Sequence, residues 1–126
     1  MRFTTAWKRS LERVKPNKVF SLLGLATKAG RTASGEFMTE KSVKEGTAYL
    51  VIVGTDASAN TKKNFRNMCE FYRVPYFEYG TKEELGHAMG KEMRASLAVT
   101  DAGFAKSLKK HLETAVNVME VVNGEE

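Results

Sequence analysis

A segment in the first half of the chain, residues 35–46, carries the side chains with the clearest chemical potential. At 100° per residue, a helix over this segment turns one half of its surface toward the protein interior. That inward half holds Met38, Thr39, Ser42, Val43 and Gly46. Phe37 points away from it, between Lys41 and Lys44. An outward ring flanked by lysines suits a stacked nucleobase with phosphates on the ammonium groups, although a neighbouring loop of the protein would cover the ring equally well.

Groups that attract anions surround this segment. Gly35 precedes the expected helix and leaves the backbone N–H groups of its first turn open to phosphate oxygens. The side chains expected to contact phosphates are Lys28, Arg31, Lys41, Lys44 and Arg94. Arg94 belongs to a loop, residues 91–94, that precedes an expected strand, and loops at sheet ends often carry function. A helix over residues 59–73 adds a polar face, expected to be solvated and to attract a polyanion, with Lys62, Lys63, Arg66 and Arg73.

Patterns that would support catalysis or metal binding fail on their spacing. Residues 30–35 have the glycine spacing of a phosphate-binding loop, but Glu36 stands where that motif requires a lysine. The two histidines, His87 and His111, have no Cys or carboxylate cluster at ligand spacing, and no Gly-x-Ser-x-Gly elbow occurs. Cys69 falls on an apolar helix stripe, so we expect it to pack in the core. The sequence therefore predicts a protein without enzymatic activity, metal or cofactor.

The elements that must position these side chains alternate along the chain. Capping residues and helix-period stripes predict helices over residues 17–28, 35–45, 59–73, from 81 onward, and over 102–113. Short apolar runs predict strands over residues 48–53, 75–79 and 95–100. This alternation indicates an α/β domain with a mainly buried sheet between helical layers. In the helix that starts at 81, Gly86 and Gly90 are four residues apart, which allows a neighbouring segment to pack closely.

The two ends of the chain differ from this body. Before Pro16, an apolar stripe indicates a further amphipathic helix, formed by Phe3, Trp7, Leu11 and Val14. Residues 1–31 hold eight basic side chains against Glu12 alone, whereas the whole chain has a net charge of +5. A basic end on a near-neutral body predicts contact with a polyanion. The segment after residue 113 has no Lys or Arg, and we expect it to fray.

Composition limits the class of protein. The chain has 126 residues, of which 42% are hydrophobic and 28% charged, which is typical of one soluble globular domain. Its longest apolar run, residues 48–53, is far shorter than the roughly 20 residues of a membrane span. No signal-peptide pattern follows the basic start, so we expect a cytoplasmic protein.

Six short segments carry a resemblance to a known family. They are residues 22–26 (LLGLA), 34–36 (SGE), 56–61 (DASANT), 85–92 (LGHAMGKE), 98–101 (AVTD) and 103–105 (GFA). In this order they resemble the YlxQ-type bacterial ribosomal-protein-like family, in the superfamily of ribosomal proteins L-seven-Ae and L-thirty-e. The resemblance covers about residues 18–113. Several such segments in one order are specific evidence, whereas any one alone would be weak.

The resemblance implies a fold, a partner and a site. The fold is a three-layer α/β/α sandwich with a mixed, about four-stranded sheet over residues 17–113, between a basic extension (1–16) and a tail (114–126). The implied partner is structured RNA of the kink-turn type, a sharply bent internal loop with tandem G·A pairs. Ribosomal RNA and the ribosome are candidate partners, and neither DNA nor a membrane is expected. The implied contacts are Gly35, Glu36, Phe37, Met38 and Lys41 at the helix start, with Glu92, Met93 and Arg94 in the loop.

One departure from the superfamily pattern separates two functional hypotheses. Archaeal members place an Asn-Glu pair at the positions of Phe37 and Met38, where it hydrogen-bonds the G·A pairs. Neither side chain here forms such bonds, so the base contacts of this chain must differ in part. The leading hypothesis is a non-enzymatic RNA-binding protein. Because other superfamily members work through protein contacts, the alternative is a protein-interaction module that binds an acidic protein through Phe37 and the basic N-terminal segment.

Overall fold

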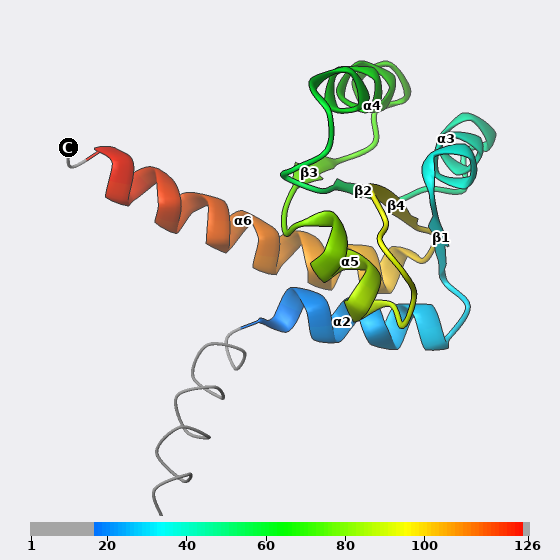
Figure 1. Cartoon of the computed structure of the whole chain (residues 1–126), viewed down its shortest axis with the longest axis horizontal. Coiled ribbons are helices and arrows are strands. Elements are labelled where there is room, and N and C mark those ends of the chain that lie inside the picture. Colours follow the sequence, from blue (N-terminus) through cyan, green and yellow to red (C-terminus); the bar gives the residue numbers. More distant parts are fainter. Residues whose placement is uncertain (1–16, 125–126) are drawn as a thin grey trace, which may run out of the picture.

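The computed structural model describes residues 17–124, which form three layers (Figure 1). Two helices cover one face of a four-stranded sheet, and the other three described helices cover the opposite face. The helices are α2 (Lys18–Lys28), α3 (Glu36–Glu45), α4 (Ala59–Tyr72), α5 (Lys82–Ala88) and α6 (Ala102–Gly124). The strands are β1 (Thr32–Ser34), β2 (Leu50–Val53), β3 (Tyr76–Glu78) and β4 (Ser96–Val99). The expected three-layer α/β/α sandwich with a mixed sheet is confirmed.

The strands are ordered β1-β4-β2-β3 across the sheet. β4 is antiparallel to both of its neighbours, with Ala98 opposite Ala33 on one side and Val51 on the other. β2 and β3 are parallel, with Ile52 opposite Phe77. Because β2 and β4 lie in the middle and helices cover both faces, every residue of these two strands is buried. Burial on both faces explains why their sequences are apolar and not alternating.

Each face of the sheet has its own hydrophobic cluster. The cluster under α2, α5 and α6 comprises Val19, Leu23, Leu50, Ile52, Leu85, Met89, Leu97, Val99, Ala105, Leu108 and Leu112. The cluster under α3 and α4 comprises Val43, Ala48, Val51, Val53, Ala57, Phe65, Cys69 and Ala98. Burial raises the pKa of the Cys69 thiol to about 12, so the thiol stays protonated at neutral pH. The expectation that Cys69 packs in the core is confirmed.

The structure corrects two expectations about element boundaries. Sequence patterns give no sign of β1, because its three half-buried residues form an edge strand without an apolar run. α6 continues to Gly124, so the helix end expected at residue 113 is wrong. No Pro or Gly interrupts residues 114–123, and a lack of basic residues is not a helix stop signal. The amphipathic helix expected before Pro16 lies outside the described residues. None of the helices between residues 17 and 124 is long and apolar enough to cross a membrane.

Candidate nucleic-acid interface

α3 differs from the other described helices in how it begins. In the other four, a side-chain oxygen accepts a hydrogen bond from the first turn, and the acceptors are Asn17, Ser58, Thr81 and Asp101. α3 begins at Gly35, which has a φ of 93° and no side chain to form a cap. The Gly35 N–H donates to the Ser96 carbonyl at 2.9 Å, but the next three N–H groups have no acceptor within the helix. This end of α3 therefore presents open donors and the positive end of the helix dipole.

The first turn of α3 exposes two large apolar side chains. Phe37 is 75% exposed, so its predicted outward position is confirmed and no loop of the described chain covers the ring. Met38 is 44% exposed, so the prediction that it faces the sheet is wrong. Met38 lies about 100° around the helix from Phe37, at the edge of the inward half. The side chains of α3 that are buried are Thr39, Ser42 and Val43.

The two lysines of α3 flank Phe37, as their spacing predicts. Together with Phe37, Glu40 and Glu45 they line a shallow hollow of about 370 Å³ on the helix surface. Lys44 Nζ lies 2.8 Å from Glu40 Oε2, and this carboxylate raises the pKa of Lys44. Lys41 has no carboxylate within 4.0 Å among the side chains that the structure describes. Lys41 is thus ready to hold a phosphate, whereas Lys44 must first leave an exposed ion pair, a kind that contributes little to stability.

The loop between α5 and β4 is fastened to the start of α3 by Arg94. Arg94 Nε donates to Ser34 Oγ at 3.1 Å, directly before Gly35. Its Nη1 donates to the Met93 carbonyl at 2.9 Å, so the guanidinium also fixes the shape of its own loop. The Met93 side chain is 60% exposed. The loop residues expected near the start of α3 are therefore close to it, with Arg94 as the link and Met93 open to a ligand.

A buried glycine in α5, Gly86, lets the same loop pack directly against this helix. The Lys91 N–H donates to the Gly86 carbonyl at 2.8 Å. A Cβ atom at Gly86 would overlap the Glu92 carbonyl group, so only glycine lets the loop lie against the helix this closely. The close packing that the Gly86 position permits is realised here, and it determines where Glu92 and Met93 lie.

The basic residues before β1 lie apart from this surface. Arg31 precedes β1 and Gly35 follows it, so at the usual rise of a strand about 13 Å separates them. Arg31 Nε is 4.0 Å from Asp101 Oδ1, in a loose pair at the surface. Lys28 is exposed in the last turn of α2. The structure thus brings the start of α3 and the loop together and leaves Lys28 and Arg31 at the opposite end of β1.

Two residues that shape this surface, Ser34 and Glu40, are not among the site residues predicted from the sequence. The pairing of Glu40 with Lys44 has a local signal, because residues four apart on a helix are neighbours. The bond between Ser34 and Arg94 joins positions 60 residues apart, and no local pattern indicates it.

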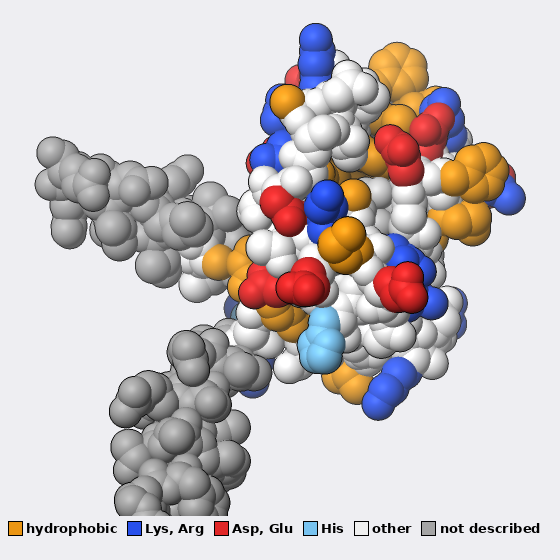
Figure 2. Space-filling view, viewed as in Figure 1, with side chains coloured by type: hydrophobic (Ala, Val, Ile, Leu, Met, Phe, Trp, Pro, Cys, Tyr) orange, Lys and Arg blue, Asp and Glu red, His pale blue; other side chains and the backbone are white. Residues whose placement is uncertain are grey.

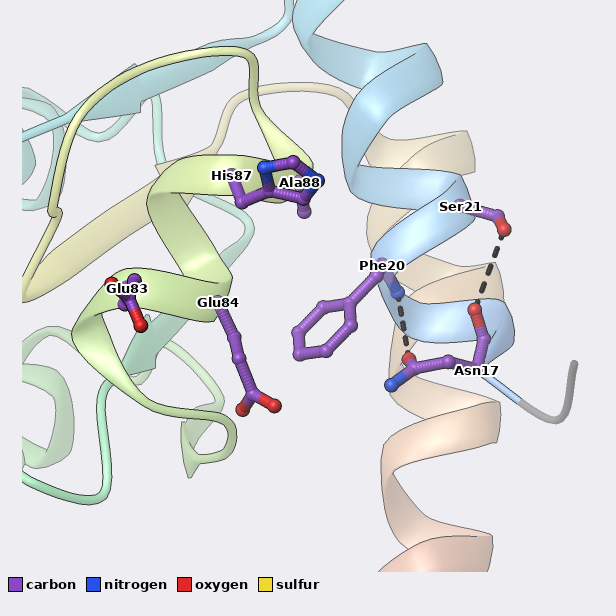
Figure 3. Close-up of a pocket in the computed structure, with 7 residues that line it drawn as sticks. All are labelled: Asn17, Phe20, Ser21, Glu83, Glu84, His87 and Ala88. Carbon is purple, nitrogen blue, oxygen red and sulfur yellow. Dashed lines mark hydrogen bonds between the residues drawn. The ribbon is translucent and has the colours of Figure 1, made fainter. Parts of the chain in front are cut away.

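A second hollow, of about 560 Å³, lies on the other side of the sheet between the start of α2 and α5 (Figure 3). The Phe20 ring and Ala88 supply apolar walls, and Glu83 and Glu84 supply carboxylates. His87 lines it from the last turn of α5. Within residues 17–124, no group of three or more potential ligands could hold a metal ion. Because carboxylates repel phosphates, this hollow is a poor site for a polyanion.

Comparisons with known proteins identify relatives of similar length. The RNA-binding protein YlxQ of Bacillus subtilis (strain 168) is 44% identical over 89 residues, which are 71% of this chain and 89% of that protein. The RNA-binding protein YlxQ of Enterococcus faecium is 38% identical over 96 residues, which are 76% of this chain and 92% of that protein.

Solved structures share the fold. A protein of unknown function from Bacillus halodurans C superposes with a TM-score of 0.74 and 38% identity, over 76% of this chain and 97% of that one. The Giardia lamblia 15.5kD RNA binding protein superposes with a TM-score of 0.67 over 75% of this chain and 84% of that one. Its identity is only 22%, so this likeness concerns the fold alone. The model of one family matches residues 17–109. On this match and the identity to the YlxQ proteins, the chain belongs to the ribosomal protein L7Ae/L30e/S12e/Gadd45 family.

Proposed function

We propose that this protein binds structured RNA, without catalysing a reaction, at the surface formed by the start of α3 and the loop before β4. The observation that carries the proposal is the uncapped start of α3 beside that loop, with Phe37 and Met93 exposed. The similar YlxQ proteins are RNA-binding proteins, which supports the same ligand class. We propose a sharply bent RNA of the kink-turn type as the target, with ribosomal RNA as its cellular source.

Each part of the surface suits a different part of a bent RNA. The open N–H groups of α3 and the Lys41 ammonium suit phosphate oxygens. The Phe37 ring suits stacking with an unpaired base, and Met93 offers an adaptable apolar contact to a base turned out of the helix. The carboxylates of Glu36 and Glu92 accept hydrogen bonds from the N–H groups of base edges. A straight duplex presents no such combination, because its deep, narrow major groove hides the bases.

Phe37 and Met38 replace the Asn-Glu pair of the archaeal relatives. Their side chains form no strong hydrogen bonds with G·A pairs. In this proposal the Phe37 ring and the Met38 thioether pack on bases. The hydrogen bonds to the RNA are formed instead by the backbone N–H groups at the start of α3 and by the carboxylates of Glu36 and Glu92.

A protein-interaction module is the second candidate. α3 carries Glu36, Glu40 and Glu45 as well as its two lysines, so its charge is not that of a purely basic RNA surface. The exposed Phe37 ring would also fit an apolar groove on a protein. The two candidates differ in whether a bend in the RNA matters.

A comparison of two RNAs tests the proposal. We expect the full chain to bind a kink-turn RNA at least about tenfold more tightly than the same duplex without its bulge, a difference of about 1.4 kcal/mol. Gel-shift titrations of both RNAs at one salt concentration measure it. Equal or absent binding to the two RNAs would contradict specific recognition of a bend and would favour the protein-interaction module.

The salt dependence of binding measures how many phosphates the protein contacts. Arg94 is expected to stay with Ser34, and Lys28 and Arg31 lie at the opposite end of β1, which leaves Lys41 and Lys44 to release counterions. With two contacts, the slope of log K against log salt should be about −1.5. The measurement is a series of kink-turn titrations between low and moderate salt. A slope near zero would show that these residues do not touch the RNA.

A further inference from the structure

The carboxyl end of α4 carries an exposed aromatic pair that the proposed RNA surface does not use. Phe71 is 78% exposed and Tyr72 is 41% exposed. Their ring centroids lie 4.9 Å apart with an interplanar angle of 78°, so the two rings contact each other edge to face. A partner that covers these rings would remove apolar surface from water.

This aromatic pair continues the surface of α3. β1 and β2 run in the same direction, because both are antiparallel to β4. α3 and α4 follow these strands and pack against each other, so their carboxyl ends lie at the same end of the layer. Lys44 is in the last turn of α3, at the end of that helix that lies beside the carboxyl end of α4. Figure 2 shows hydrophobic side chains standing out on this α3 and α4 side, with charged side chains between them.

The residue that follows the pair has an unusual backbone. Arg73 caps α4 in the left-handed conformation, with a φ of 60° and a ψ of 46°. Among the described residues it is the only non-glycine with a positive φ. Glycine commonly occupies this position at a helix end, and an L side chain there carries a steric cost. A strained residue of this kind points to a role for its side chain, and the Arg73 side chain is exposed.

Two of the other cations of α4 are engaged within the protein. Lys62 Nζ lies 3.8 Å from Glu78 Oε1, and Arg66 Nη2 lies 3.2 Å from Glu78 Oε2. Arg73, in contrast, has no carboxylate within 4.0 Å among the described side chains. The cation next to the aromatic pair is thus available to a ligand.

We infer that Phe71, Tyr72 and Arg73 bind an unpaired RNA strand that leaves the bent part of the RNA. A base stacks on the aromatic pair, and Lys44 and Arg73 hold the phosphates on either side of it. Exposed aromatic rings next to cations are typical of single-strand binding, which tolerates any base because every base has a flat face. The inference rests on the proposed function for the position of the bend, but it concerns a different part of the RNA.

The experiment compares RNAs with and without an unpaired extension. Dissociation constants of the full chain are measured for a blunt-ended kink-turn RNA and for the same RNA with about six unpaired uridines on its 5′ or its 3′ end. We expect one of the two extensions to tighten binding about fivefold or more. Phe71→Ala should remove this gain and leave the blunt RNA within about twofold of its original affinity. Leu25→Ala, which truncates an exposed side chain on the opposite layer, should retain the gain.

Arg73→Gly gives an independent readout. Glycine adopts a φ of 60° without steric cost, so the melting temperature should stay the same or rise while the gain from the extension falls. A merely structural role for Arg73 would leave the gain unchanged.

The outcomes separate this inference from the proposed function. If neither extension tightens binding, or if Phe71→Ala keeps the gain, the inference is wrong while blunt-RNA binding can still support the proposed function. If only extended RNA binds, and does so through Phe71, the inference holds and the proposed function fails. Self-association that is lost in Phe71→Ala, without any effect of the extensions, would assign the pair to a protein contact and overturn the inference.

Discussion

Replacing Phe37 with alanine is expected to weaken binding of a kink-turn RNA by about 1–3 kcal/mol, the usual value of one base stacked on an aromatic ring. The melting temperature should hardly change, because the ring is 75% exposed and contributes little to the core. Gel-shift titration and thermal unfolding of the same variant measure the two quantities. The combination of a large binding effect with a small stability effect is what identifies a contact residue.

Two further variants serve as references for the stability and the binding effects of Phe37→Ala. Phe65→Ala removes a ring that is 1% exposed, and it should cost about 3–5 kcal/mol of stability. Lys41→Ala should weaken binding to all RNAs evenly and reduce the steepness of the salt slope by about one unit, as the loss of a phosphate contact does. If Phe37→Ala instead melts several degrees lower and binds RNA normally, the interface does not lie on this face of α3.

Replacing Gly86 with alanine is expected to lower stability by about 1–3 kcal/mol, because the added methyl group overlaps the Glu92 carbonyl and is met by backbone that cannot simply rotate away. The loop that carries Met93 must shift, and binding of kink-turn RNA should weaken with it. Thermal unfolding gives the first effect, and gel-shift titration at a temperature where the variant is fully folded gives the second.

Gly103→Ala is the matched control for this substitution. It also adds a methyl group to a helical glycine, but the nearest atom is Oδ2 of the Asp101 side chain, at 3.2 Å. Stability should stay the same or rise by up to about 1 kcal/mol, since alanine favours a helix more than glycine does. An unchanged melting temperature for Gly86→Ala would show that the loop moves without cost. A lower melting temperature with unchanged RNA affinity would remove the loop from the interface.

Much of the fold follows from local patterns and from the family resemblance. The strands β2 and β4 can be predicted from their apolar runs, because burial on both faces selects apolar residues at every position. The helix start at Thr81 can be predicted because Glu84 stands three residues later, as in a capping box. Both hydrogen bonds of that capping box are present in the structure. β1 cannot be predicted from the sequence, because an edge strand of three half-buried residues has no distinctive composition. The strand order follows from no local pattern, since it depends on how all the elements pack together.

The candidate interface divides in the same way between sequence and structure. The sequence by itself determined that Phe37 points outward between two lysines, and that α3 begins without a side-chain cap at Gly35. Both features depend only on the period and the end of one helix. At Met38, on the edge between the two halves, the helical period alone is not decisive, and the neighbouring elements decide its exposure.

Only the tertiary structure decided which distant segments meet. It brings Arg94 to Ser34 and the Glu92 carbonyl to Gly86, and it leaves Arg31 at the other end of β1 from the start of α3. The direction of a side chain within one element follows from that element's own geometry. Its neighbours from elsewhere in the chain depend on the order β1-β4-β2-β3 and on the packing of two helical layers, which are properties of the whole chain and of no single segment.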